Sequence, residues 1–266
     1  MRIAELIAYH VQIPLKTRIR HASYTRRMTD SLVVRCRLAD GTEGWGEGLP
    51  REYVTGETID SAFELLRDTP LAQQLDSELE SPEAAIDVCE RFELTRPEAD
   101  PRNCFGNSIR CAVELSILSA VCRASELPLS AITSLFGPAA GIRNPQEEVQ
   151  YSAVITSSSP VKQHIKSFLI WLHGFHQTKV KVGVENVDDE VCLRRIRRLV
   201  GPKMDLRIDA NESWTCKNLE SKFEPLEKFN ITSIEQPVHH TEIDGLAKIR
   251  PNIAPPIMLD ESLCSV

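Results

Sequence analysis

The feature that most constrains the fold is a repeat in the second half of the chain. Charged residues close four successive short apolar segments, and these residues, Lys181, Asp209, Glu235 and Asp260, are spaced 28, 26 and 25 residues apart. Helix-like stretches, such as 188–200, separate the apolar segments. One βα unit has about this length, and serial βα units build a parallel sheet or a (β/α)8 barrel. The apolar segments expected as strands are 149–155, 178–183, 204–211, 231–237 and 256–262.

The first half of the chain has a different order of expected strands and helices. Strand-like segments come first, with Asp40-Gly41 as a hairpin turn, and helical patterns follow. The expected strands are 2–13, 30–40 and 42–48, and the expected helices are 57–67, 82–92 and 106–124. We therefore predict an α/β protein with an α+β domain over 1–145. A (β/α)8-type barrel domain, of which about five βα units are present, follows over 146–266.

Composition narrows the class of protein. The chain has 266 residues, 42% of them hydrophobic and 26% charged, which is typical of a globular protein with a sizeable core. The net charge of −7 and the lack of a basic stripe argue against nucleic acid, and no apolar run is long enough to span a membrane. The eight cysteines form no C-x-x-C pair, so we expect reduced thiols in a cytoplasmic protein.

Polar side chains gather at the expected strand ends. The C-terminal ends of parallel strands share one face, and neighbouring strands lie about 4.8 Å apart, so Asp209, Glu235 and Asp260 can converge. Converging carboxylates repel unless a cation lies between them, and Mg²⁺ prefers oxygen ligands. The alternative is that "NES" after Asp209 and "ES" after Asp260 only cap helices.

The stretch "TKVKVG" places Lys179 and Lys181 on one face of a strand. A neighbouring ammonium and partial burial both lower a lysine's pKa, and a neutral amine is a base for the proton α to a carboxylate. The alternative is an edge strand with two solvated lysines. His239 and His240, after the fourth strand of the repeat, are expected in a loop at the pocket rim.

Six segments together resemble the enolase superfamily, in the muconate-lactonizing subgroup of its mandelate racemase/muconate lactonizing enzyme family. In the barrel half they are "TKVKVG", "RIDANESW", "SIEQP" and "LDES", in this order and spacing. In the first half they are "DGTEGWGEGLPREYVTGET" (40–58) and "CAVELSILSAVCRASELPLSAI" (111–132), which look like the capping domain of that family.

The resemblance implies a role for each matching residue. Lys181 would be the acid/base, and Lys179 would depress its pKa and contact the substrate carboxylate. The implied Mg²⁺ ligands, with their supporting neighbours Asn211 and Glu261, are Asp209, Glu235 and Asp260. Two loop-like segments of the capping domain, 17–30 and 49–58, would fold over the pocket. They offer the substrate-binding candidates Arg18, His21, Tyr24 and Thr55.

The implied reaction is removal of the proton α to a carboxylate through an enediolate that Mg²⁺ stabilises. We expect 1,1-proton transfer, as in dipeptide epimerases, on a small dipeptide or muconate-like carboxylate, in a homo-oligomer. Muconate-type cycloisomerisation and o-succinylbenzoate synthesis use the same residues and stay open. The family pattern continues with a second lysine and three further βα units, whereas this sequence stops six residues past Asp260. The alternative to an active enzyme is therefore a truncated remnant that is catalytically incomplete.

Overall fold

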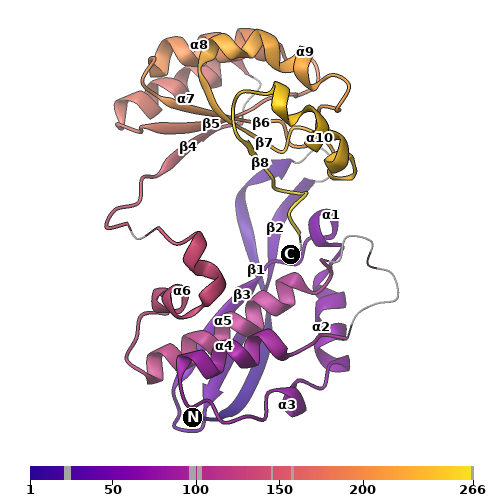
Figure 1. The fold of residues 1–266 in the computed structure, drawn as a ribbon, viewed down its shortest axis with the longest axis vertical. Coiled ribbons are helices and arrows are strands. Elements are labelled where there is room, and N and C mark those ends of the chain that lie inside the picture. The colour runs from indigo at the N-terminus through magenta and orange to yellow at the C-terminus, as the bar shows by residue number, and fades with distance from the viewer. Residues whose placement is uncertain (21–24, 96–99, 101–103, 145, 157–158, 265–266) are drawn as a thin grey trace. The chain divides into compact units, whose positions relative to one another are not determined.

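The computed structural model describes residues 1–20, 25–95, 100, 104–144, 146–156 and 159–264. The chain divides into two compact units, Met1–Pro145 and Gln146–Cys264. The first contains an antiparallel sheet and the second a parallel one, each with its own helices (Figure 1). The predicted α/β class, with an α+β part followed by a partial (β/α) barrel, is confirmed.

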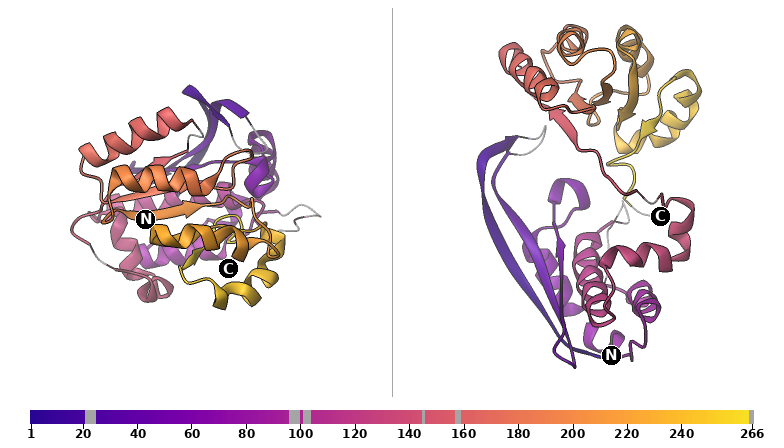
Figure 2. Two further views of the ribbon diagram at one scale, coloured as in Figure 1. Left: turned by 90° about the horizontal axis from the view of Figure 1, so that it is seen from above. Right: turned by 90° about the vertical axis from the view of Figure 1, so that its left-hand side faces the viewer.

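The first unit has a three-stranded antiparallel sheet in the order β1-β2-β3. Helices α4 and α5 lie on one face of this sheet, and they enclose an apolar core with it (Figure 2). The strands are β1 (Ile3–Arg20), β2 (Thr25–Leu38) and β3 (Glu43–Gly48). The α-helices are α1 (Glu52–Thr55), α2 (Ile59–Asp68), α3 (Leu71–Gln74), α4 (Pro82–Arg91), α5 (Asn107–Ala124) and α6 (Ile132–Leu135). The 3-10 helices are η1 (Leu129–Ala131) and η2 (Gly137–Gly141).

Helix α5 packs directly on β3 because three alternate residues of that strand are glycines. A Cβ atom at Gly46 would lie 2.1 Å from the carbonyl oxygen of Ala112, and one at Gly48 would lie 1.8 Å from that of Ser108. Both oxygens belong to the backbone of α5, so no side-chain movement can relieve the clash. The alternation of glycine along β3 therefore sets how closely the helix approaches the sheet.

The segment 17–30, expected as a mobile loop, is largely strand. β1 continues to Arg20 and β2 begins at Thr25, and their backbones pair as Ile19 with Arg26 and Arg20 with Thr25. The loop prediction was wrong here because polar side chains do not prevent two strands from pairing through their backbones.

The segment 49–58 likewise contains a short helix, α1. Thr55 is the last residue of that helix, and Gly56 follows with a φ of 76°. The segment, expected to be loop-like, is therefore partly helical, and Gly56 ends the helix in the left-handed conformation.

The second unit is a five-stranded parallel sheet in the order β4-β5-β6-β7-β8. The strands are β4 (Ser152–Ile155), β5 (Gln177–Lys181), β6 (Asp205–Asp209), β7 (Ile231–Glu235) and β8 (Ile257–Met258). The α-helices are α7 (Pro160–Leu172), α8 (Asp189–Val200), α9 (Leu219–Phe223) and α10 (Ile243–Ile249). The 3-10 helices are η3 (Glu224–Phe229), η4 (His240–Glu242) and η5 (Arg250–Asn252).

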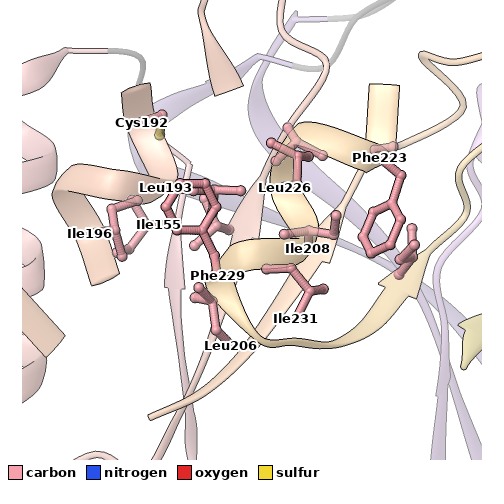
Figure 3. Packing of buried hydrophobic residues seen from close by; sticks show 14 of the residues in the cluster. Ile155, Cys192, Leu193, Ile196, Leu206, Ile208, Phe223, Leu226, Phe229 and Ile231 are labelled. Carbon is pink, nitrogen blue, oxygen red and sulfur yellow. The ribbon is translucent and has the colours of Figure 1, made fainter. Parts of the chain in front are cut away.

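Helices α7, α8 and α9 cover one face of this parallel sheet, side by side (Figures 1 and 2). Side chains from the sheet and the helices form a continuous apolar core between these layers (Figure 3). Leu206 and Ile208 of β6 point into this core and are fully buried. Because side chains alternate along a strand, their neighbours Arg207 and Asp209 belong to the opposite face of the sheet.

Within the described part of the chain, no single helix has the length and apolar character needed to cross a membrane. One bent pair, α5 with the segment Leu129–Leu135, meets the length and composition test.

Candidate active site

The parallel register places the charged residues of three strands at one level. Lys181 of β5 pairs with Asp209 of β6, and Asp209 pairs with Glu235 of β7. All three are the last residues of their strands. Since the strands are parallel, these residues lie side by side along the C-terminal edge of the sheet, where α/β proteins place their sites.

Two of these groups are buried carboxylates. Asp209 is 4% exposed and Glu235 is 6% exposed, so their charges are poorly solvated and repel each other. The ammonium of Lys179 lies between them, with Nζ 2.6 Å from Oε1 of Glu235 and 3.3 Å from Oδ2 of Asp209. One cation therefore offsets the repulsion of two buried anions.

This contact sets the protonation state of Lys179. Burial by itself lowers the pKa of the Lys179 amine, but the hydrogen bond to Glu235 and the charge of Asp209 outweigh burial and raise that pKa above its ordinary value. Lys179 is therefore a cation at neutral pH.

Asn211 connects Lys181 to the acidic groups. Its side-chain oxygen accepts a hydrogen bond from Nζ of Lys181 at 3.1 Å, and its Nδ2 donates to Oε1 of Glu261 at 2.7 Å. Its backbone N–H donates to Oδ1 of Asp209 at 2.9 Å. Asn211 has a φ of 46°, in the left-handed region that asparagine tolerates better than most residues. The predicted supporting pair, Asn211 and Glu261, thus lies in one hydrogen-bonded chain with Lys181.

Asp260 lies two residues beyond β8, the strand next to β7. Its backbone N–H donates to Oε1 of Gln236 at 2.9 Å, and the residue is exposed. Among the described residues, no hydrogen bond or ion pair engages its carboxylate. The structure thus brings Asp209 and Glu235 together through Lys179, whereas the carboxylate of Asp260, at the adjacent strand end, has no side-chain partner among the residues that the structure describes.

Gln236 is a positioning residue to which the sequence assigned no role. Its side chain is fully buried, and Oε1 accepts from the backbone N–H groups of both Asp260 and Ser262. Its Nε2 donates to the carbonyl of Val238 and to Oγ of Ser262. This one amide fixes the loop that carries Asp260 and Glu261 against the end of β7. The only signal in the sequence is a polar side chain directly after the expected strand, between Glu235 and Pro237.

Negative charge is concentrated around this loop. Burial raises the pKa of the Glu261 carboxyl, and the nearby charges of Asp260, Glu212 and Asp209 raise it further. The negative charges that make Glu261 harder to ionise would also attract a cation to this loop.

The predicted substrate-binding residues belong to the first unit. Arg18 is an exposed residue of β1, and the Thr55 hydroxyl donates to the carbonyl of Arg51 at 3.3 Å. His21 and Tyr24 lie outside the described residues. Substrate contact by these four side chains stays a prediction.

Comparison with known proteins points to one group of enzymes. The family described as "Enolase C-terminal domain-like" matches residues 166–266. Over 267 residues the chain is 27% identical to the L-Ala-D/L-Glu epimerase of Bacillus subtilis, a match that covers 99% of this chain and 68% of that protein. It is 29% identical to the D-Ala-D/L-Ala epimerase of Cytophaga hutchinsonii, with 100% of this chain and 67% of that protein covered.

A solved structure agrees with these sequence matches. The dipeptide epimerase of Enterococcus faecalis, complexed with Mg and the dipeptide L-Leu-L-Tyr, superimposes with a TM-score of 0.80 at 26% identity. The superposition covers 98% of this chain and 68% of that one. The likeness thus extends over both units of the chain.

Proposed function

Because this chain belongs to the enolase superfamily, we propose that it removes the proton α to the carboxylate of a dipeptide and returns a proton to the same carbon. This is 1,1-proton transfer, the chemistry of an epimerase or racemase. The observation that carries the proposal is the row of Lys181, Asp209 and Glu235 at one level of the sheet edge.

The residues at this edge fit a magnesium ion. Asp209, Glu235 and Asp260 offer only oxygen atoms. The carboxylates of Asp209 and Glu235 share the ammonium of Lys179, and that of Asp260 has no partner within the described part of the chain. This is the donor set of a hard divalent ion, and these three side chains would hold it. Mg²⁺, when bound, would stabilise the negative charge that develops on the substrate carboxylate as the α-proton leaves.

Lys179 and Lys181 would divide the remaining work. Lys179 stays charged because of its carboxylate partners, so it supplies a fixed positive charge toward the substrate carboxylate. Lys181 takes the α-proton on Nζ, and its hydrogen bond to Asn211 orients that nitrogen.

A dipeptide is the substrate class that the relatives favour. The matched proteins are named for epimerisation of L-Ala-D/L-Glu and D-Ala-D/L-Ala, and their likeness spans nearly all of this chain. An α-carbon next to a carboxylate is present in every dipeptide, at its C-terminal residue, and its proton is the one that the proposed base removes.

The test is proton exchange in heavy water. The chain is incubated with Mg²⁺ and a panel of dipeptides that includes L-Ala-L-Glu, and the α-proton signal is followed by NMR. We expect the signal to disappear, because a proton taken by Lys181 is replaced by deuterium from solvent. Lys181→Ala should abolish this exchange, whereas Lys166→Ala, on the exposed surface of α7, should leave it unchanged. No exchange with any dipeptide, or equal exchange in Lys181→Ala, would overturn the proposal.

A further inference from the structure

A second group of metal-ligating side chains lies in the loops after β6 and β7. One ligand atom from each of Glu212, His239 and His240 lies within 4.8 Å of the others. None of these residues belongs to the carboxylate set assigned to magnesium above. Two imidazoles and one carboxylate also form a chemically different donor set, with nitrogen as well as oxygen.

The backbone holds the two loops together. The N–H of Glu212 donates to the carbonyl of Gln236 at 2.9 Å, and the N–H of Trp214 donates to that of Pro237 at 3.0 Å. Trp214 also forms a parallel bridge with Val238, immediately before the two histidines. The ligand atoms are therefore brought together by main-chain pairing rather than by chance contact of surface side chains.

Glu212 orients His240. Its Oε1 accepts from the backbone N–H of His240 at 2.7 Å and lies 2.8 Å from Nδ1 of the same residue. A carboxylate that accepts from one imidazole nitrogen fixes the tautomer and leaves the other nitrogen with a free lone pair, as metal sites commonly require. His239 is held separately, with Nδ1 2.8 Å from Oγ1 of Thr241, and its ring lies 4.1 Å from the ring of His240.

The three side chains are exposed enough for an ion to reach them from solvent. His239 is exposed, whereas the side chains of His240 and Glu212 are 25% and 22% exposed. Three protein ligands leave a coordination position open for water or another small ligand.

We propose that Glu212, His239 and His240 bind a divalent transition-metal ion of the zinc type, at a site separate from the magnesium carboxylates. Imidazole nitrogen favours Zn²⁺, Co²⁺ or Ni²⁺ over Mg²⁺, and one carboxylate completes a three-ligand set. The edge of the sheet thereby has two neighbouring cation sites of different selectivity.

The experiment is calorimetric titration of the whole chain with Zn²⁺ in excess Mg²⁺, which occupies the oxygen ligands first. The visible absorption of Co²⁺ is recorded in parallel, because it reports nitrogen ligation independently of catalysis. We expect one Zn²⁺ to bind in excess Mg²⁺, and His239→Ala and His240→Ala each to weaken binding roughly tenfold or more. Circular dichroism verifies that both variants are folded.

Two variants make the assignment specific. His173→Ala removes an imidazole of the same unit outside the cluster and should leave Zn²⁺ affinity unchanged. Asp260→Asn alters the oxygen set and should also leave it unchanged. Absence of Zn²⁺ binding, binding that persists in both cluster variants, or binding lost in Asp260→Asn would overturn the proposal.

Discussion

The ammonium of Lys179 lies 2.6 Å from Oε1 of Glu235 and 3.3 Å from Oδ2 of Asp209, so one cation serves two buried carboxylates. Breaking a buried ion pair from one side leaves uncompensated charge, which is more costly than the pair itself is favourable. The lysine at this position therefore stabilises the sheet edge as well as serving the proposed chemistry.

Lys179→Met should lower the free energy of unfolding by about 2 kcal/mol or more, because the two carboxylates are left without a partner. Mg²⁺ should restore more stability to this variant than to the unaltered chain, since the ion replaces the missing charge. Urea denaturation with and without Mg²⁺ measures both effects, with Lys166→Met as the control. Equal Mg²⁺ stabilisation of variant and unaltered chain would contradict the replacement of the Lys179 charge by the ion.

Asp209→Ala should abolish Mg²⁺ binding, whereas Lys181→Ala should retain it. We propose Asp209 as a ligand of the ion and Lys181 as the group that acts on the substrate proton only. Isothermal titration calorimetry measures the two affinities directly. Equal loss in both variants would contradict the division of roles between the two residues.

Gln236→Leu should destabilise the protein by about 2–3 kcal/mol, because backbone N–H groups of the Asp260 loop lose their buried acceptor. It should also weaken Mg²⁺ binding, since Asp260 is no longer held beside Glu235. Urea denaturation gives the first quantity and calorimetry the second. Loss of stability with unchanged Mg²⁺ affinity would show that Gln236 does not position the site.

Gly46→Ala should destabilise the first unit by about 1–3 kcal/mol or more, because the new Cβ meets the backbone of α5 at 2.1 Å. Gly137→Ala is a matched control, as a Cβ there meets no atom within 4 Å. Thermal unfolding of the two variants should differ by several degrees. Similar melting temperatures would mean that α5 can move away from β3 at little cost.

Buried cysteines should make stability fall at alkaline pH. Burial raises the pKa of the Cys36 and Cys89 thiols from 9.0 to about 12, so the unfolded chain loses these protons first as pH rises. The unfolded state then binds fewer protons than the native state, and the free energy of unfolding falls between about pH 9 and 12. Urea denaturation across this range measures the slope, which Cys36→Ala should reduce.

The same burial predicts a labelling pattern. At about pH 8, iodoacetamide should modify the exposed Cys111 before Cys36 or Cys89, because only ionised and accessible thiols react. Mass spectrometry of the labelled peptides identifies the modified residues. Early modification of Cys36 in the folded chain would contradict its buried position.

Much of the fold followed from two periods in the sequence. The spacing from Lys181 to Asp209 to Glu235 indicated serial βα units, and the period of two along a strand placed Lys179 and Lys181 on one face. In a parallel sheet the C-terminal strand ends share one edge, and in this structure the register brings these three to one level. The row of charged residues could therefore be predicted without coordinates.

The segment 17–30 was misread as a loop for a physical reason. None of the described side chains in this segment belongs to the apolar core of the first unit, and Met28 is 41% exposed, so no core imposes an alternating pattern on the segment. Its strands are specified by backbone pairing, which leaves little trace in residue type.

By itself, the sequence determined the class of the fold and the face and level of Lys181, Asp209 and Glu235. Only the tertiary structure decided that Lys179 binds both carboxylates, that Gln236 holds the Asp260 loop, and that Glu212 meets His240. Periodicity fixes the face on which a side chain emerges, because backbone geometry repeats along a strand. It does not fix the contacts of a long side chain or the path of a loop, because these depend on neighbours that are distant in sequence.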